Sequence, residues 1–314
     1  MSKTLAIIVV LLAAACIYSQ DANEFNERGV KSFDRGDYDS AIGDFTRAIE
    51  LSSRLTSRSS DDFRKNFING DTSASDADRV TVIDPLTAVA YTGRGKAYFA
   101  KGKFDQAIND YDHALAITPS MTAALLCRGI ARLGMQQLDL ALADFERVLK
   151  LNNKNIGGYI GRGAVRQAQG NLTAAADDFN TAIKLEPKNP MAYYYRGESK
   201  RRLGKLSEAL ADFEYSIALN SKLPNGFLGR GMVRLGQGQF EESIKDLTQA
   251  LERDGRLVHA YANRGFCYLA LRRDSDAQAD FARAIEMDPS IEGEIQAARS
   301  KLFPSPGING VNPK

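Results

Sequence analysis

Length, composition and charge already exclude several classes of protein. The chain has 314 residues and a formal net charge of +2, from 41 basic and 39 acidic residues, so no excess charge points to a nucleic-acid partner. It has two histidines, and no metal-ligand spacing, phosphate-binding loop or nucleophile motif stands out. We therefore expect no enzyme activity, no catalytic residue, no metal, no cofactor and no small-molecule substrate.

The first twenty residues are typical of an export signal. Lys3 precedes an apolar run from Leu5 to Leu12, and the small residues Ala13 to Ala15 suit cleavage. The apolar stretch is shorter than the about 20 residues that cross a membrane. We expect residues 1–20 to be a signal peptide and the protein to be exported: periplasmic, cell-envelope-associated or secreted. A retained anchor is the alternative.

Cys16 leaves a second question open at this end of the chain. The segment resembles a bacterial lipoprotein signal, in which Cys16 would carry a lipid, but Ala13 stands where leucine is usual. Lipidation with membrane association through the N-terminus, and ordinary cleavage without it, both remain open.

An Arg-Gly pair recurs every 34 residues along most of the chain, from Arg94 to Arg264. A constant period of this length indicates stacked helix–turn–helix units. A seventh pair, at Arg28, lies almost two periods before Arg94, so the array is interrupted once. We expect this order along the chain: repeat 1 at 22–55, an insertion at 56–87, repeats 2 to 7 at 88–291, a cap helix at 292–303 and a disordered tail at 304–314.

Each unit repeats the same residue sizes. A large apolar residue lies four positions before the glycine. A small residue lies twelve positions after the glycine, and in most units another lies nineteen positions after it. An aromatic residue or leucine lies sixteen positions after it. The last three positions share one face of a second helix. The turn before that helix usually holds a glycine, and a capping residue such as Asp105 or Asp139 is expected to start the helix.

This pattern resembles the tetratricopeptide repeat (TPR) family, over about residues 22 to 291 apart from the insertion. The resemblance implies an all-α fold: a right-handed superhelix (α-solenoid) of seven helix–turn–helix repeats with a C-terminal cap helix. It also implies that the inner side, lined by the first helices, binds a protein or peptide.

Arginine and aspartate replace the commoner leucine and tyrosine at two positions of every unit. We interpret them as a ladder of Arg–Asp pairs between packed helices, with a second cation one turn along in the middle units. A structural role is favoured, and an electropositive track for an anionic ligand is the alternative. The ladder residues from the second unit on are Arg94, Arg128, Arg162, Arg196, Arg230, Arg264, Asp110, Asp144, Asp178, Asp212, Asp246 and Asp280.

The resemblance also predicts which residues face the partner. They form a mostly apolar channel with a polar patch at Tyr194, Glu198 and Arg201, and an apolar surface favours an amphipathic helix or an extended apolar peptide. The predicted binding residues are Leu126, Ile130, Leu133, Ile160, Tyr194, Glu198, Arg201, Leu228, Met232, Leu235 and Phe266.

The composition of the insertion at 56–87 predicts a loop or a partly disordered segment. It is either a passive insertion or a lid over the binding surface. The leading hypothesis for the whole chain is a non-catalytic, exported scaffold that binds proteins. The alternative is an accessory subunit of an envelope enzyme or assembly complex, with the insertion as its regulatory or active element.

Overall fold

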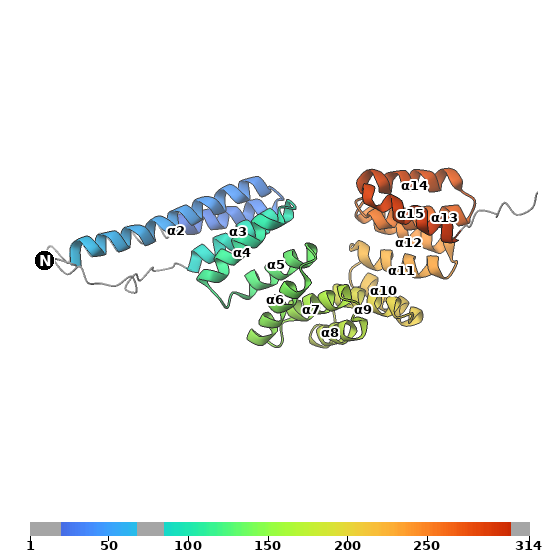
Figure 1. The fold of residues 1–314 in the computed structure, drawn as a ribbon, viewed down its shortest axis with the longest axis horizontal. Coiled ribbons are helices and arrows are strands. Elements are labelled where there is room, and N and C mark those ends of the chain that lie inside the picture. The colour runs from blue at the N-terminus through green and yellow to red at the C-terminus, as the bar shows by residue number, and fades with distance from the viewer. Residues whose placement is uncertain (1–19, 68–84, 303–314) are drawn as a thin grey trace, which may run out of the picture. The chain divides into compact units, whose positions relative to one another are not determined.

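The computed structural model describes residues 20–67 and 85–302, and within these ranges every regular element is a helix (Figure 1). Side chains are described for residues 20–53 and 85–300. The expected signal peptide with Cys16, and the tail at 304–314, lie outside the described residues. No strand occurs in the described part of the chain.

The helices alternate as first and second members of successive pairs. After the helix over 20–34, the first helices are α3 (Pro85–Ala100), α5 (Thr122–Gly134), α7 (Ile156–Ala168), α9 (Pro190–Arg202), α11 (Pro224–Gly236) and α13 (Val258–Ala270). The second helices are α2 (Tyr38–Phe67), α4 (Phe104–Ile117), α6 (Leu138–Leu151), α8 (Leu172–Leu185), α10 (Leu206–Leu219), α12 (Phe240–Arg253) and α14 (Asp274–Met287). A short 3-10 helix η2 (Pro289–Ile291) leads into α15 (Glu292–Leu302). The all-helical fold of paired helices with a helix at the end is confirmed.

The chain divides into two compact units, Met1–Val165 and Arg166–Lys314, and each is described by itself. In the first unit, α2, α3 and α4 pack in sequence, and α4 also contacts α5. In the second, α9 packs against α8 and α10, and the first helix α11 also contacts the first helices α9 and α13. First helices that lie side by side provide a continuous surface within each unit.

The expected loop at 56–87 is wrong over its first part. Helix α2 runs from Tyr38 to Phe67 (Figure 1). The second helices of the later repeats are each 14 residues long. The stretch from Ser52 to Phe67 holds no proline or glycine, so nothing in it stops helix propagation. The next repeat begins at Pro85, three residues before the predicted 88, because proline suits the first turn of a helix. Residues 68–84 lie outside the described part.

The turn between the two helices of a repeat requires a left-handed backbone. Gly102 has φ of 72°, and the glycines at the same place in four other repeats have similar values. Gln136 and Arg272 occupy this place in two repeats and take φ of 59° and 58°. The turn therefore imposes its conformation on residues that rarely adopt it, at a cost of about 1 kcal/mol each.

The expected helix caps are also corrected. Asp105 and Asp139 lie inside the first turn of α4 and α6, and the N-cap positions are Lys103 and Gln137, whose side chains make no capping bond. Carboxylates in the first turn still favour the helix by interacting with its dipole. The backbone N–H of Ser40 donates to Asp37 (3.1 Å), so a side-chain cap is present at the start of α2.

In every second repeat the core holds an aromatic ring between two glycines. A Cβ added at Gly129 would lie 2.8 Å from the ring of Phe145, and one added at Gly161 would lie 2.2 Å from it. Phe145 is fully buried. In the second unit, Phe213 lies in the same way between Gly197 and Gly229. The ring of a second helix thus fills a space that exists only because both neighbouring first helices lack a side chain there.

This packing alternates from one repeat to the next. The position before the ladder arginine is glycine at 93, 161 and 229, which is every second repeat. In the intervening repeats it is Cys127, Tyr195 and Asn263. Tyr195 stacks on Phe179 (ring centroids 5.5 Å apart), and Cys127 hydrogen-bonds Tyr111. The packing unit in the described residues is therefore a pair of repeats, although the Arg-Gly period is a single repeat.

Candidate binding surface on the first helices

The Arg–Asp ladder joins the first and second helices of a repeat through two parallel hydrogen bonds. Arg94 donates from Nε to Asp110 Oδ2 (2.9 Å) and from Nη2 to Oδ1 (2.7 Å). The same arrangement is found in the pairs Arg128–Asp144, Arg196–Asp212, Arg230–Asp246 and Arg264–Asp280. Bidentate geometry of this kind is the strongest form of an Arg–carboxylate contact.

The first ladder pair differs from this pattern. Arg28 is exposed and contacts Asp44 through Nη2 alone (3.1 Å). The carboxylate of Asp178 accepts from Arg166 (2.8 Å). The guanidinium of Arg162 lies over the ring of Tyr159, 5.5 Å from its centroid.

A second cation binds the same carboxylate in the middle repeats. Arg132 donates to Asp144 (2.7 Å) and Arg234 to Asp246 (2.7 Å). Lys200 lies 2.9 Å from Asp212 in the same role. Because the ladder aspartates are between 1% and 6% exposed, each is a buried charge that needs these partners.

The ladder arginines also reach back to the preceding repeat, which the sequence analysis did not anticipate. Arg128 Nη1 donates to Asp112 (2.6 Å) and Arg196 Nη1 to Asn180 (2.7 Å), both on the second helix of the repeat before. Arg264 Nη1 reaches Thr248 (3.0 Å) in the same way. One guanidinium therefore ties together three helices. The hydrogen bond to Asp110 raises the pKa of Arg94, so its charge is permanent. This geometry makes the ladder a structural element.

The apolar residues predicted to face a partner differ in exposure. In the first unit Ile130 is 47% exposed, whereas Leu126 and Leu133 are half-buried against the core around Phe145. Ile160 is half-buried as well. In the second unit Leu228, Met232 and Leu235 are half-buried, with Leu228 and Leu235 packed against the core around Leu247. Ile130 is the most exposed of these residues.

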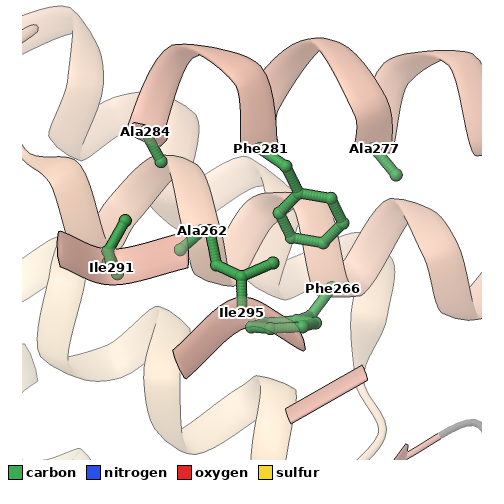
Figure 2. Close-up of a cluster of buried hydrophobic side chains, with 7 residues drawn as sticks. All are labelled: Ala262, Phe266, Ala277, Phe281, Ala284, Ile291 and Ile295. Atoms are coloured by element: carbon green, nitrogen blue, oxygen red, sulfur yellow. The ribbon is translucent and has the colours of Figure 1, made fainter. Parts of the chain in front are cut away.

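The prediction of Phe266 as a binding residue is wrong. Figure 2 shows its ring among Phe281, Ile291 and Ile295, and Phe266 is 8% exposed. Its ring lies edge-on to that of Phe281, with centroids 5.1 Å apart. Because η2 and α15 follow the last repeat, their isoleucines cover the surface that earlier first helices leave open.

Tyr194, Glu198 and Arg201 lie on one face of α9, at spacings of four and three positions. Arg201 donates from Nε and Nη2 to the two oxygens of Glu198, both at 2.7 Å. Tyr194 is hydrogen-bonded by Asn225 of the adjacent helix α11, which the sequence analysis missed. Burial, and then the carboxylate of Glu198, raise the pKa of Tyr194 to about 12, so the phenol stays protonated. We call these four residues the α9 polar site.

The sequence carried little signal for Asn225. It follows Pro224 at the start of a helix, where asparagine is common for conformational reasons alone.

No group of three or more His, Cys, Asp or Glu side chains in the described residues could hold a metal ion. No helix among them is long and apolar enough to cross a membrane.

Family models agree with the period of the Arg-Gly pairs. A "TPR repeat" model matches residues 95–136, and a "tetratricopeptide repeat" model matches residues 161–224 and 228–290. Together these matches cover more than half of the 314 residues. The chain belongs to the tetratricopeptide repeat family. TPR proteins generally act as scaffolds for protein interactions, and the TPR fold is typically non-enzymatic.

Solved structures of TPR proteins share the fold. A thermophilic TPR protein of Thermus thermophilus is 19% identical, with a TM-score of 0.53 over 58% of this chain and 99% of that one. A TPR protein of Parabacteroides merdae is 21% identical, with a TM-score of 0.53 over 79% and 99%. The Cut9–Hcn1 structure of the APC/C is 14% identical, with a TM-score of 0.64 over 88% of this chain and 54% of that chain. Among curated proteins, none matches the chain at a significant level.

Proposed function

We propose that this TPR protein is a non-catalytic scaffold that binds a protein or peptide segment on the surface of its first helices. The observation that carries the proposal is the exposure of Ile130 on a first helix. Ile130 has a large apolar side chain that is 47% exposed, whereas Leu126 and Leu133 of the same helix pack against the core around Phe145. A binding partner would remove this apolar area from water.

Val30 supports the same assignment. It lies two positions after the ladder arginine of the first repeat, as Ile130 does in the third, and it is also exposed. The first and third repeats therefore expose an apolar residue at the same repeat position, on the same face of the first helix. Such a face suits an amphipathic helix or an extended apolar peptide.

The substitution Ile130→Glu tests the proposal against a matched control. Leu140 is 52% exposed on the second helix α6, so Leu140→Glu makes the same change at similar exposure on the other helix of that repeat. We expect Ile130→Glu to reduce recovery of a partner from the native cell-envelope fraction by about ten-fold or more, because a charge would enter an apolar interface. Leu140→Glu should leave recovery unchanged.

Quantitative mass spectrometry of the captured proteins measures this difference. Equal recovery by both variants, with unchanged helix content by circular dichroism, would contradict a first-helix binding surface. Loss with Leu140→Glu alone would place the interface on the second helices.

We also propose that the protein is exported and acts at or near the cell envelope. The sequence of residues 1–20 supports this, and Cys16 is the candidate site of lipid attachment. Cell fractionation should recover the protein outside the cytoplasm with residues 1–15 or more removed. Labelling with a palmitate analogue should mark wild type and leave Cys16→Ser unmarked if the lipid is present. Cytoplasmic recovery with the first residues intact would refute export.

A further inference from the structure

The first helices carry an unequal charge. From α3 to α13 they contain thirteen basic residues and one acidic residue, Glu198. The ladder aspartates that balance many of these cations belong to the second helices and are buried beneath them. The side chains that a ligand meets first along the first helices are therefore mostly cationic or apolar.

The α9 polar site lies beside apolar residues at the equivalent positions of the next repeat. The residues at the positions of Tyr194, Glu198 and Arg201 in the next repeat are Leu228, Met232 and Leu235. A polar group in an otherwise apolar row of a half-buried surface costs free energy unless it is used. The exception therefore marks where a hydrogen-bonding ligand would be recognised.

The hydrogen bonds of this site leave two donors without partners among the described residues. Both oxygens of Glu198 already accept from Arg201 through Nε and Nη2, so Nη1 of Arg201 makes no hydrogen bond within the described residues. The amide N–H of Asn225 can donate to the oxygen of Tyr194. The O–H of Tyr194 is then left to donate to another group.

The charge balance of α9 favours an anion over a neutral acceptor. Arg201 and Glu198 neutralise each other, and Lys200 is paired with Asp212. Arg202 is exposed and donates only to a neutral group, the carbonyl of Gln167 (2.9 Å). Arg202 thus leaves one positive charge on α9 without a carboxylate partner among the described residues.

We propose that the α9 polar site binds a carboxylate of an acidic side chain in the partner, with apolar partner residues on either side of it packing on Leu228 and Met232. The carboxylate accepts from Arg201 Nη1 and from the hydroxyl of Tyr194. This inference rests on the proposed function and adds the chemistry of the partner: an acidic residue set between apolar ones.

A phage-displayed library of random dodecapeptides, selected on the full chain, tests the proposal. The selected peptides should carry Asp or Glu next to apolar residues. One such peptide and its counterpart with Gln or Asn in place of the acid are then titrated by fluorescence anisotropy. We expect the amide counterpart to bind about ten-fold more weakly to wild type, because hydrogen bonds to an ionised group are the stronger ones.

Variants separate the site from general binding. Arg201→Met should weaken binding of the acidic peptide by about ten-fold and leave binding of its amide counterpart unchanged. Tyr194→Phe removes the hydroxyl alone and should change the two affinities in the same direction. Lys205→Met, at an exposed lysine in the turn after α9, is the matched control and should change neither affinity. Thermal unfolding followed by circular dichroism shows whether each variant is folded.

The outcomes distinguish the two proposals. Selected peptides that are basic or lack an acid, or an equal effect of Arg201→Met on both peptides, would overturn the carboxylate assignment while leaving a first-helix binding surface in place. Failure of the library to yield any specific peptide would count against the surface and the carboxylate together.

Discussion

Replacing Asp246 by alanine lowers the free energy of unfolding by about 3–5 kcal/mol, because the change strands partly buried cations. Arg230 donates to both oxygens of Asp246 (3.0 and 2.7 Å), and Arg234 adds a third bond (2.7 Å). The arginine side chains are 20% and 24% exposed, so water replaces the lost carboxylate only in part. Urea denaturation followed by circular dichroism measures the loss.

Lys245→Ala is the control for this experiment. It removes an exposed charge from the adjacent position of the same helix and should change stability by no more than about 0.5 kcal/mol. If Asp246→Ala proves as mild as Lys245→Ala, the ladder contributes no more than surface ion pairs do and the structural role argued above fails.

The substitution Gly161→Ala destabilises the protein by about 1–3 kcal/mol, although alanine is the better helix former. Its methyl group would lie 2.2 Å from the ring of Phe145. The ring has little space to retreat, because it also lies close to Gly129, where an added Cβ would be only 2.8 Å from it. The ring or the helix must therefore move, and the movement costs more than the gain in helix propensity.

The same substitution at Gly43 provides the opposite case. A Cβ at Gly43 has no atom within 4 Å, and the residue lies exposed inside α2 of the same unit. Gly43→Ala should therefore stabilise by roughly 0.5–1 kcal/mol through the lower entropy of its unfolded chain. Opposite shifts of the two denaturation midpoints are the expected result. Shifts of the same sign would show that the contact between Gly161 and Phe145 is not tight.

The period of the Arg-Gly pairs was sufficient to predict the class of fold and the helix pairs, because each repeat contacts only its neighbours and one unit determines the next. The offset between Arg94 and Asp110, identical in every repeat, likewise indicated two groups on facing helices. The prediction from composition was wrong at 56–67, where serines, aspartates and arginines suggested a loop but the structure has a helix. Such residues are only weakly unfavourable in a helix, and α2 was already nucleated by the repeat before them.

The candidate site was predicted only in part. The spacing of Tyr194, Glu198 and Arg201 placed them on one helix face, since i, i+4 and i+7 positions align in any α-helix. The contribution of Asn225 could not be foreseen, because it depends on how closely α11 lies beside α9. Phe266 occupies the same repeat position as Ile130, yet it is buried because the chain after the last repeat folds back over it.

The sequence by itself determined the period, the type of each element and the residue pairs within a repeat, since these follow from helix geometry and chain distance. Only the tertiary structure decided which surface stays open and that the packing alternates between successive repeats. It also decided that the third guanidinium nitrogen, Nη1, of several ladder arginines donates to the preceding repeat. These depend on the separation of helices from different repeats. A repeat pattern fixes the order of those helices but not the side chains that meet between them.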